Sequence, residues 1–257
     1  RYSWNFGMEL PPSVMNYSVD LLFSEMDEAG ISMGVVPGRK GAAYLGQVSN
    51  DDIMDIVRQY PKRFVGVCGI DASDRQGSIE EIERTVVNGP LKGVGLEPGV
   101  QPNPMRCDDA RIYPIYEFCA QHNVPVLIMG GGGNGPDQTY SMPQDIEHVC
   151  IDFPTLTVIN THGGYPWVPQ ILFTAMRRPN LYLCPDMYMF NMPGAQDYVT
   201  AANYFLQDRF LFGTAYPYIP HKVAVSMFKE MGFKEEVLPK VFWKNAARAL
   251  NLDINED

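Results

Sequence analysis

Short apolar runs and helical periods alternate along almost the whole of this sequence, and this alternation restricts the fold more than any other feature. Residues 19–29 space their apolar side chains as an amphipathic helix does, the pattern stops at Gly30, and the apolar run 31–36 follows directly. The same order then repeats to residue 250. Strands that alternate with helices form parallel sheets, because each helix carries the chain back to where the next strand starts.

The apolar runs are expected to be strands. They begin near Ile31, Phe64, Leu91, Val124, Leu156, Leu181 and Phe210. Helices are expected between and after them, at 51–60, from Ser78, and at 109–121, 144–150, 168–176, 196–206 and 236–250. Ser78 and Glu81 have the spacing of a capping box, in which two side chains satisfy the free amides at a helix start.

Chain length and element order predict a TIM-type (β/α)8 barrel. The 257 residues match the roughly 250 typical of that fold, so we expect one domain over 1–257. The visible strands are one short of the eight that close a barrel, and we expect the first strand to lie upstream of Arg1. An open doubly wound sheet is the alternative, but no G-x-G-x-x-G follows the first visible strand, which disfavours its dinucleotide-binding form.

Composition excludes several classes of partner. A net charge of −10 repels nucleic acid and anionic membrane surfaces, and no apolar run reaches the roughly 20 residues that span a bilayer. We therefore expect a cytoplasmic protein that binds a small molecule. The five cysteines are an odd number without C-x-x-C spacing, which argues against a disulfide framework and against a cysteine zinc site.

Polar side chains at the ends of the expected strands are the candidates for chemistry. In parallel barrels the active site lies on the loops that follow the strands, so the last residues of each strand face it. The residues at these positions are Arg39, Asp71, Glu97, Met129, His162, Asp186, Ala215 and Tyr216.

Several of these positions lie in recognisable motifs. Residues 161–164 read Thr-His-Gly-Gly, 211–217 read Leu-Phe-Gly-Thr-Ala-Tyr-Pro, and 244–250 read Lys-Asn-Ala-Ala-Arg-Ala-Leu, while 60–64 read Tyr-Pro-Lys-Arg-Phe. Together they resemble the amidohydrolase-related family that includes aminocarboxymuconate-semialdehyde decarboxylase. The resemblance covers nearly the whole chain and implies a barrel enzyme, often assembled as a homodimer, that hydrolyses or decarboxylates small molecules.

The resemblance also implies a metal ion, held by a His-x-His pair on the first strand, histidines on the fifth and sixth strands, and a late aspartate. His162 matches the sixth-strand histidine, whereas Met129 occupies the fifth-strand position and Ala215 replaces the aspartate. A zinc site needs about three protein ligands. We therefore expect no cofactor, with a divalent metal such as zinc only if upstream residues supply ligands, and a reaction that is metal-independent.

Three residues are predicted to be catalytic. His162 would act as acid or base, and Glu97 or Asp186 would orient it or exchange protons with it. Arg39 is predicted to hold a substrate carboxylate, although it could equally neutralise Glu97. We expect His122, His148 and His221 to be surface or capping residues.

The remaining predicted substrate contacts are Met129, Tyr140, Tyr188 and Tyr216, which would line an aromatic pocket, unless the aromatic residues are simply core. The glycine-rich segment 130–136 is expected to be a flexible loop where backbone approaches the ligand. It lacks the Gly-Lys-Ser/Thr ending of a phosphate-binding loop.

The resemblance thus implies a hydrolase of a small carboxylated, aromatic or lactone-like compound. A decarboxylase of the same family is one alternative, and a barrel that binds a small molecule without converting it is another.

Overall fold

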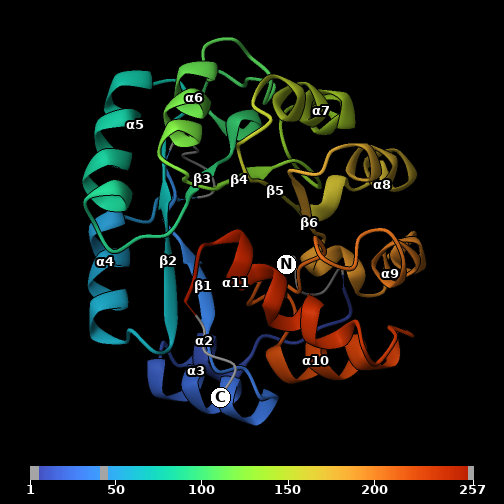
Figure 1. The fold of residues 1–257 in the computed structure, drawn as a ribbon. Coiled ribbons are helices and arrows are strands. Elements are labelled where there is room, and N and C mark those ends of the chain that lie inside the picture. The colour runs from blue at the N-terminus through green and yellow to red at the C-terminus, as the bar shows by residue number, and fades with distance from the viewer. Residues whose placement is uncertain (1–5, 41–45, 254–257) are drawn as a thin grey trace.

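The computed structural model describes residues 6–40 and 46–253, and its sheet is parallel throughout (Figure 1). Six strands follow one another in chain order. They are β1 Gly34–Pro37, β2 Phe64–Gly69, β3 Val94–Leu96, β4 Val126–Met129, β5 Val158–Thr161 and β6 Leu181–Cys184. The expected seventh strand is reduced to one parallel bridge between Phe210 and Leu183. Among the described residues the fold is therefore TIM-barrel-like, with six strands rather than a closed ring of eight.

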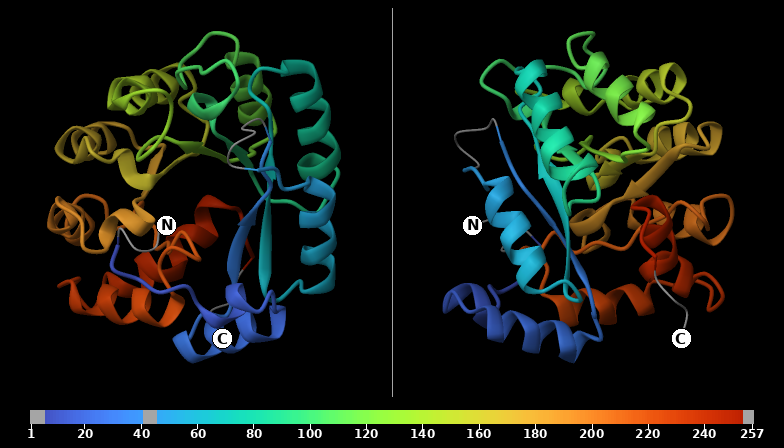
Figure 2. Two further views of the ribbon diagram at one scale, coloured as in Figure 1. Left: turned by 180° about the vertical axis from the view of Figure 1, so that it is seen from behind. Right: turned by 60° about the vertical axis from the view of Figure 1, so that its left-hand side comes forward.

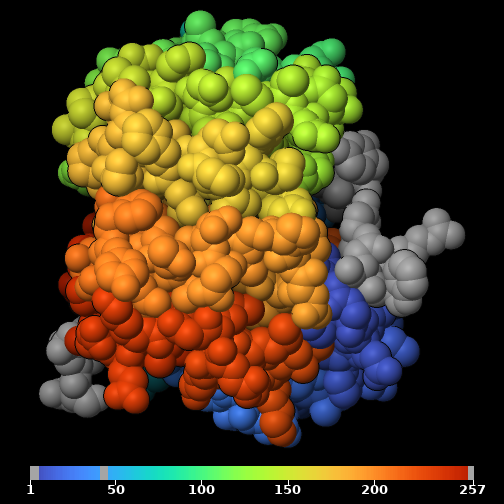
Figure 3. All heavy atoms as spheres, turned by 90° about the vertical axis from the view of Figure 1, so that its right-hand side faces the viewer, coloured from blue at the N-terminus to red at the C-terminus, as the bar shows by residue number. Residues whose placement is uncertain are grey.

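Most helices lie on the outer side of this sheet (Figures 1 and 2). The α-helices are α2 Pro12–Met15, α3 Val19–Ala29, α4 Asn50–Gln59, α5 Arg75–Ile82, α6 Tyr113–Gln121, α7 Pro143–Asp152, α8 Val168–Arg177, α9 Ala195–Asn203, α10 His221–Glu230 and α11 Asn245–Ala249. Figure 3 shows α7 to α10 stacked in chain order down one face. No helix in the described part of the chain is long and apolar enough to cross a membrane.

Most helices begin and end where local chemistry dictates. Gly30 takes the left-handed conformation that ends α3, and the Ser49 side chain accepts a hydrogen bond from the first turn of α4. The expected capping box at Ser78 is wrong. The helix starts earlier, because Asp74 caps it by accepting from the amide of Gly77, and Ser78 instead donates to the carbonyl of Asp71.

Side chains on the strands divide into two apolar layers. One set, such as Val126 and Ile128, packs against the helices and forms the larger core. The other faces the inside of the barrel, where Val65, Ile159 and Leu211 meet the end of α11. In Figure 1 α11 accordingly lies inside the ring of helices.

The polar side chains of Asn180 and Arg209 fix the starts of β5 and β6. Asn180 Nδ2 donates to three main-chain carbonyls where α7 gives way to β5, at 3.1–3.2 Å. Arg209 Nη1 donates to three carbonyls where α8 gives way to β6, at 2.7–2.9 Å. Because buried carbonyls without donors are costly, these contacts hold in place the two strands that carry His162 and Asp186 at their far ends.

Candidate active site

His162 and Asp186 meet at the carboxyl ends of β5 and β6. Asp186 is buried, and its Oδ2 lies 2.9 Å from Nδ1 of His162 and 3.2 Å from the His162 amide. Its Oδ1 also accepts from the amide of Met187 at 2.6 Å. The carboxylate thus fixes the orientation of the imidazole, while Nε2 makes no hydrogen bond within the described residues. Two of the three predicted catalytic residues therefore form a pair.

The backbone at this edge is left-handed at three residues that are not glycine. The φ angles are 63° at His162, 43° at Asp186 and 45° at Ala215. Each costs about 1–3 kcal/mol, and such conformations cluster at functional sites. Two-residue alternation along β5 would place Asn160 and His162 on one face, but the turn at His162 separates them. Asn160 is in register with Ile128 and Leu183 and faces the helices as they do. The strand ends at Thr161, so this alternation does not extend to His162.

Two opposing effects set the pKa of His162. Burial has the largest single effect and lowers it, because the imidazolium loses hydration, whereas the charge of Asp186 and its hydrogen bond raise it. The charge of Glu97 also raises the pKa, and that of Arg39 lowers it. The net result is a pKa above the ordinary value of 6.5, so the imidazolium persists to higher pH than in a free histidine.

Arg39 and Glu97 form a second polar pair at the ends of β1 and β3. Arg39 donates from Nε to Oε2 at 2.9 Å and from Nη2 to Oε1 at 3.0 Å, a bidentate arrangement. The side chains are 35% and 21% exposed, so solvent and small molecules can reach them. Arg39 therefore does neutralise Glu97, one of the two roles expected of it, and the pair lies close enough to His162 for both charges to act on that residue.

Tyr188 forms an aromatic wall beside His162. The two rings meet edge to face with centroids 5.7 Å apart, and Tyr165 stacks on Tyr188 at 4.6 Å. Tyr165 was missed by the sequence reasoning, although it directly follows the Thr-His-Gly-Gly motif. The amide of Gly132 donates to the Tyr165 carbonyl, and a Cβ on Gly132 would collide with the Tyr188 hydroxyl. At Gly132 the backbone therefore approaches Tyr188 closely.

The other predicted substrate contacts lie in different surroundings. The Tyr216 hydroxyl donates to Glu25 Oε2 at 2.7 Å and bonds Ser13 Oγ, so it is already engaged by α2 and α3. Nothing in the sequence marked Glu25 or Ser13 for this role. Tyr140 is half-buried beside Gly135, and its carbonyl accepts from Asn134. Met129 is half-buried at the end of β4.

The remaining histidines lie apart from the pair. His122 and His148 are exposed, as expected. His221 begins α10 but is stacked on the Tyr216 ring at 4.2 Å, where burial lowers its pKa. Asp71 accepts two bonds from Ser73 and so caps its own turn.

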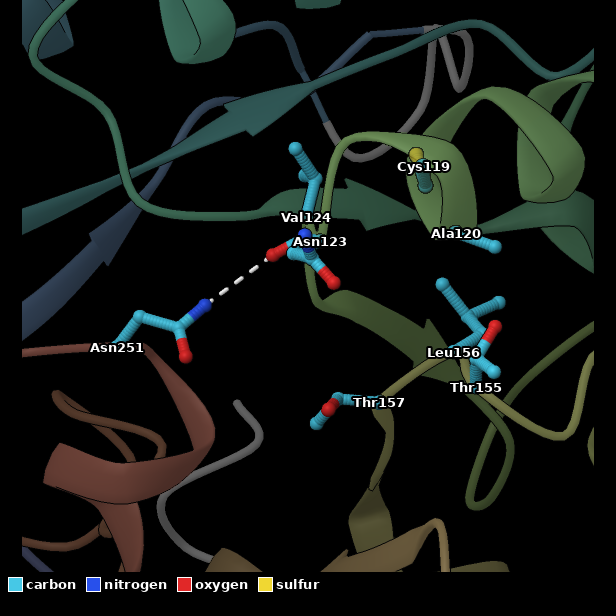
Figure 4. A pocket seen from close by; sticks show the side chains of 8 residues that line it. All are labelled: Cys119, Ala120, Asn123, Val124, Thr155, Leu156, Thr157 and Asn251. Atoms are coloured by element: carbon cyan, nitrogen blue, oxygen red, sulfur yellow. Dashed lines mark hydrogen bonds between the residues drawn. The ribbon is translucent and has the colours of Figure 1, made fainter.

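A pocket of about 90 Å³ lies at the opposite ends of the strands (Figure 4). Asn251 donates to the carbonyl of Asn123 across it at 3.1 Å. The lining residues are Cys119, Ala120, Asn123, Val124, Thr155, Leu156, Thr157 and Asn251. Val124 and Thr157 precede β4 and β5, so this is the end of the barrel associated with stability rather than chemistry.

The residues near His162 do not by themselves fit a metal ion. Over 6–40 and 46–253 no group of three or more His, Cys, Asp or Glu side chains is placed to hold one. Asp186 occupies Nδ1 of His162, and Ala215 offers no ligand atom. Of the ligand set implied by the resemblance, these residues supply Nε2 of His162 alone.

A family model described as amidohydrolase matches residues 4–252. The chain belongs to the amidohydrolase family. It is 44% identical to an uncharacterized TIM-barrel protein from Bordetella bronchiseptica, with a TM-score of 0.94 over 98% of this chain and 89% of that one.

Decarboxylases recur among the relatives. Over 142 residues the chain is 32% identical to 2-amino-3-carboxymuconate-6-semialdehyde decarboxylase of Dictyostelium discoideum, a match over 54% of this chain and 36% of that protein. The chain thus matches only about a third of that relative's length. The fold is shared with a dihydroxybenzoic acid decarboxylase from Polaromonas, at 20% identity and a TM-score of 0.70 over 93% of this chain and 87% of that one.

One expectation is overturned by these relatives. The Polaromonas decarboxylase structure contains bound manganese. The prediction that a protein of this kind has no cofactor is therefore wrong, and zinc is not the metal found there. The relatives also favour decarboxylation over the hydrolysis expected first.

Proposed function

We propose that this chain is a carbon–carbon lyase that decarboxylates a small aromatic carboxylic acid, with His162 as the proton donor. The observation that carries the proposal is the imidazole of His162, fixed through Nδ1 by the buried Asp186 and left without a protein partner at Nε2 among the described residues. The decarboxylase relatives support the reaction class, and the placement of the pair at the strand ends supports its catalytic role.

The chemistry follows from what decarboxylation requires. When the carbon–carbon bond to the carboxylate breaks, the electron pair stays on the ring carbon and that carbon must take a proton. A protonated His162 gives this proton from Nε2, and Asp186 stabilises the cation beforehand, which is why the raised pKa matters. No step is assigned to a metal ion, because the described residues do not complete a site for one.

The other polar pair would bind the substrate. A substrate carboxylate that reached Arg39 would share the guanidinium with Glu97, whose own charge keeps the surroundings of His162 favourable to a cation. Tyr188, edge-on to His162, would form the wall against which an aromatic ring packs.

A barrel that binds a small molecule without converting it is the second candidate. It is favoured by Ala215, which stands where the family resemblance implies an acid. Both candidates use the same residues, so binding alone does not separate them.

Release of carbon dioxide separates them. We would assay hydroxybenzoates and 5-carboxyvanillate with added Mn²⁺ and after chelation, and follow thermal stability with each compound. His162→Gln should lower kcat by about 10²-fold or more, the usual share of a positioned acid. His122 is an exposed histidine at the end of α6, so His122→Gln should leave the rate unchanged. Thermal stabilisation without carbon dioxide would favour the binding protein, and equal rates in both variants would remove His162 from the mechanism.

A further inference from the structure

Arg39 and Glu97 reach one another across an intervening strand. They follow β1 and β3, and β2 lies between these strands in the sheet. No main-chain ladder therefore joins the two loops, yet the side chains meet in a bidentate pair. A geometry of this kind requires that the backbone on both sides be fixed by other contacts.

Gln101 joins the two loops directly. Its side chain is almost fully buried, and Nε2 donates to the carbonyl of Glu97 at 3.3 Å and to the carbonyl of Lys40 at 3.4 Å. One amide group thus bridges the residue that bears the carboxylate and the neighbour of the residue that bears the guanidinium. Fixing a buried side chain in such a bridge costs rotamer entropy, which the contacts it makes must offset.

Asn50 fixes the other side of Arg39. It is also almost fully buried, and its carboxamide accepts from the amide of Gly69 at 2.8 Å and donates to the Gly69 carbonyl at 2.9 Å. Gly38, the residue before Arg39, lies against the same carboxamide so closely that a Cβ there would collide with Oδ1. The ends of β1 and β2 are therefore locked together around Asn50.

The network continues to the residue after Arg39. Asn50 Nδ2 also donates to Glu81 at 2.7 Å, and Lys40 forms an ion pair with the same carboxylate oxygen at 3.4 Å. Hydrogen bonds from Arg84, partial burial that opposes them, and a hydrogen bond from Asn50 together bring the pKa of Glu81 to about 2, so it is charged at neutral pH. Lys40 is held outward on Glu81 while Arg39 is directed toward Glu97.

We propose that Asn50 and Gln101 are positioning residues that hold Arg39 and Glu97 in their bidentate geometry beside His162. Neither residue belongs to the predicted site, and neither acts on substrate in this proposal. Its consequence for binding rests on the proposed function, in which Arg39 receives a substrate carboxylate. Its structural content does not, because the geometry of the pair can be measured without substrate.

The test measures the Arg39 side chain directly. The Nε–H resonance of Arg39, assigned by its loss in Arg39→Lys, reports how often that hydrogen leaves Glu97 and exchanges with water. Gln101→Met keeps the shape of the side chain and removes the donor, and Asn50→Leu does the same at the other side. Each should speed exchange about fivefold to tenfold, as expected for loss of a typical hydrogen bond. Asp55→Asn is the matched control, because Asp55 lies on α4 with Asn50 but is exposed and pairs with Arg58, outside this network.

A parallel titration with 2,6-dihydroxybenzoate separates this inference from the proposed function. Unchanged exchange in folded Gln101→Met would overturn the positioning role whatever the ligand does, and this variant decides the matter if Asn50→Leu fails to fold. Faster exchange in a protein that does not bind the ligand would uphold the positioning role and count against the carboxylate-binding role of Arg39. Faster exchange with binding weakened several-fold in Gln101→Met, with neither change in Asp55→Asn, would support both.

Discussion

The imidazole of His162 shows how a single residue combines opposite electrostatic effects. Burial alone would lower its pKa below the ordinary value of 6.5, and the carboxylate of Asp186 acts in the opposite direction, so that the pKa is raised. A half-buried histidine whose pKa is raised keeps its proton to higher pH and is better suited to give that proton to carbon. The carboxylate of Asp186 thus favours the acid role over the base role.

Replacing that carboxylate should reverse the shift. In Asp186→Asn the effect of burial remains while the charge is lost, so the pKa of His162 should fall from above 6.5 to below it. Nuclear magnetic resonance titration of the imidazole measures this. Decarboxylation, if it uses the imidazolium, should decline with rising pH and decline earlier in the variant. An unchanged pKa would mean that Asp186 does not stabilise the cation.

The same pair makes folding stability depend on pH. Because the folded pKa is raised, the pairing stabilises the protein fully below about pH 6.5, the unfolded value. The contribution is lost as pH rises through the folded pKa. The difference in unfolding free energy between the native protein and His162→Gln should therefore shrink from about pH 5 to pH 9 in urea titrations. A constant difference would contradict the raised pKa.

At the scale of elements, periodicity located the helices well and the strand ends less well. The predicted helices 51–60 and 168–176 agree with α4 and α8 to within one residue. The final helix, predicted over 236–250, is instead a π-helical turn at Lys240–Lys244 followed by α11. The alternation of side chains stops where the strand stops, so it could not predict the left-handed turn at His162. The residues of the candidate site could be named one by one from the sequence, but their pairings depend on that turn.

The glycine-rich segment 130–136 offers a matched comparison within one loop. Gly132 has φ 67° and lies against Tyr188, whereas a methyl group added at Gly133 would meet nothing within 4 Å. Gly132→Ala should destabilise the fold by about 1–2 kcal/mol from backbone strain alone, and more from the collision. Gly133→Ala should be neutral within about 0.5 kcal/mol. Thermal unfolding of both variants checks this, and equal losses would show that the loop does not pack on Tyr188.

At the scale of the whole molecule, the end of α11 joins strands from distant parts of the chain through the inner core. Leu250 is buried and packs in the cluster that contains Val65 and Ile159. Leu250→Ala should lower the free energy of unfolding by about 2–5 kcal/mol. Leu10→Ala, at a side chain that is 47% exposed, should change it by less than about 0.5 kcal/mol. Calorimetry should show one transition at lower temperature in the first variant, and a second separate transition would mean that the inner core is not shared by the whole barrel.

The homodimer that the family resemblance implies stays a prediction, which light scattering can test.

The order of the strands has a consequence for synthesis on the ribosome. Each strand from β2 to β6 pairs with the strand made just before it, so every new strand meets a partner that has already emerged. Nascent chain can therefore extend the sheet one unit at a time, with its outer apolar side covered by helices as they appear. The inner core differs, because Val65 cannot complete its packing until Leu250 has been synthesised. For most of its translation the growing barrel exposes that inner surface, which is where we expect chaperones to bind.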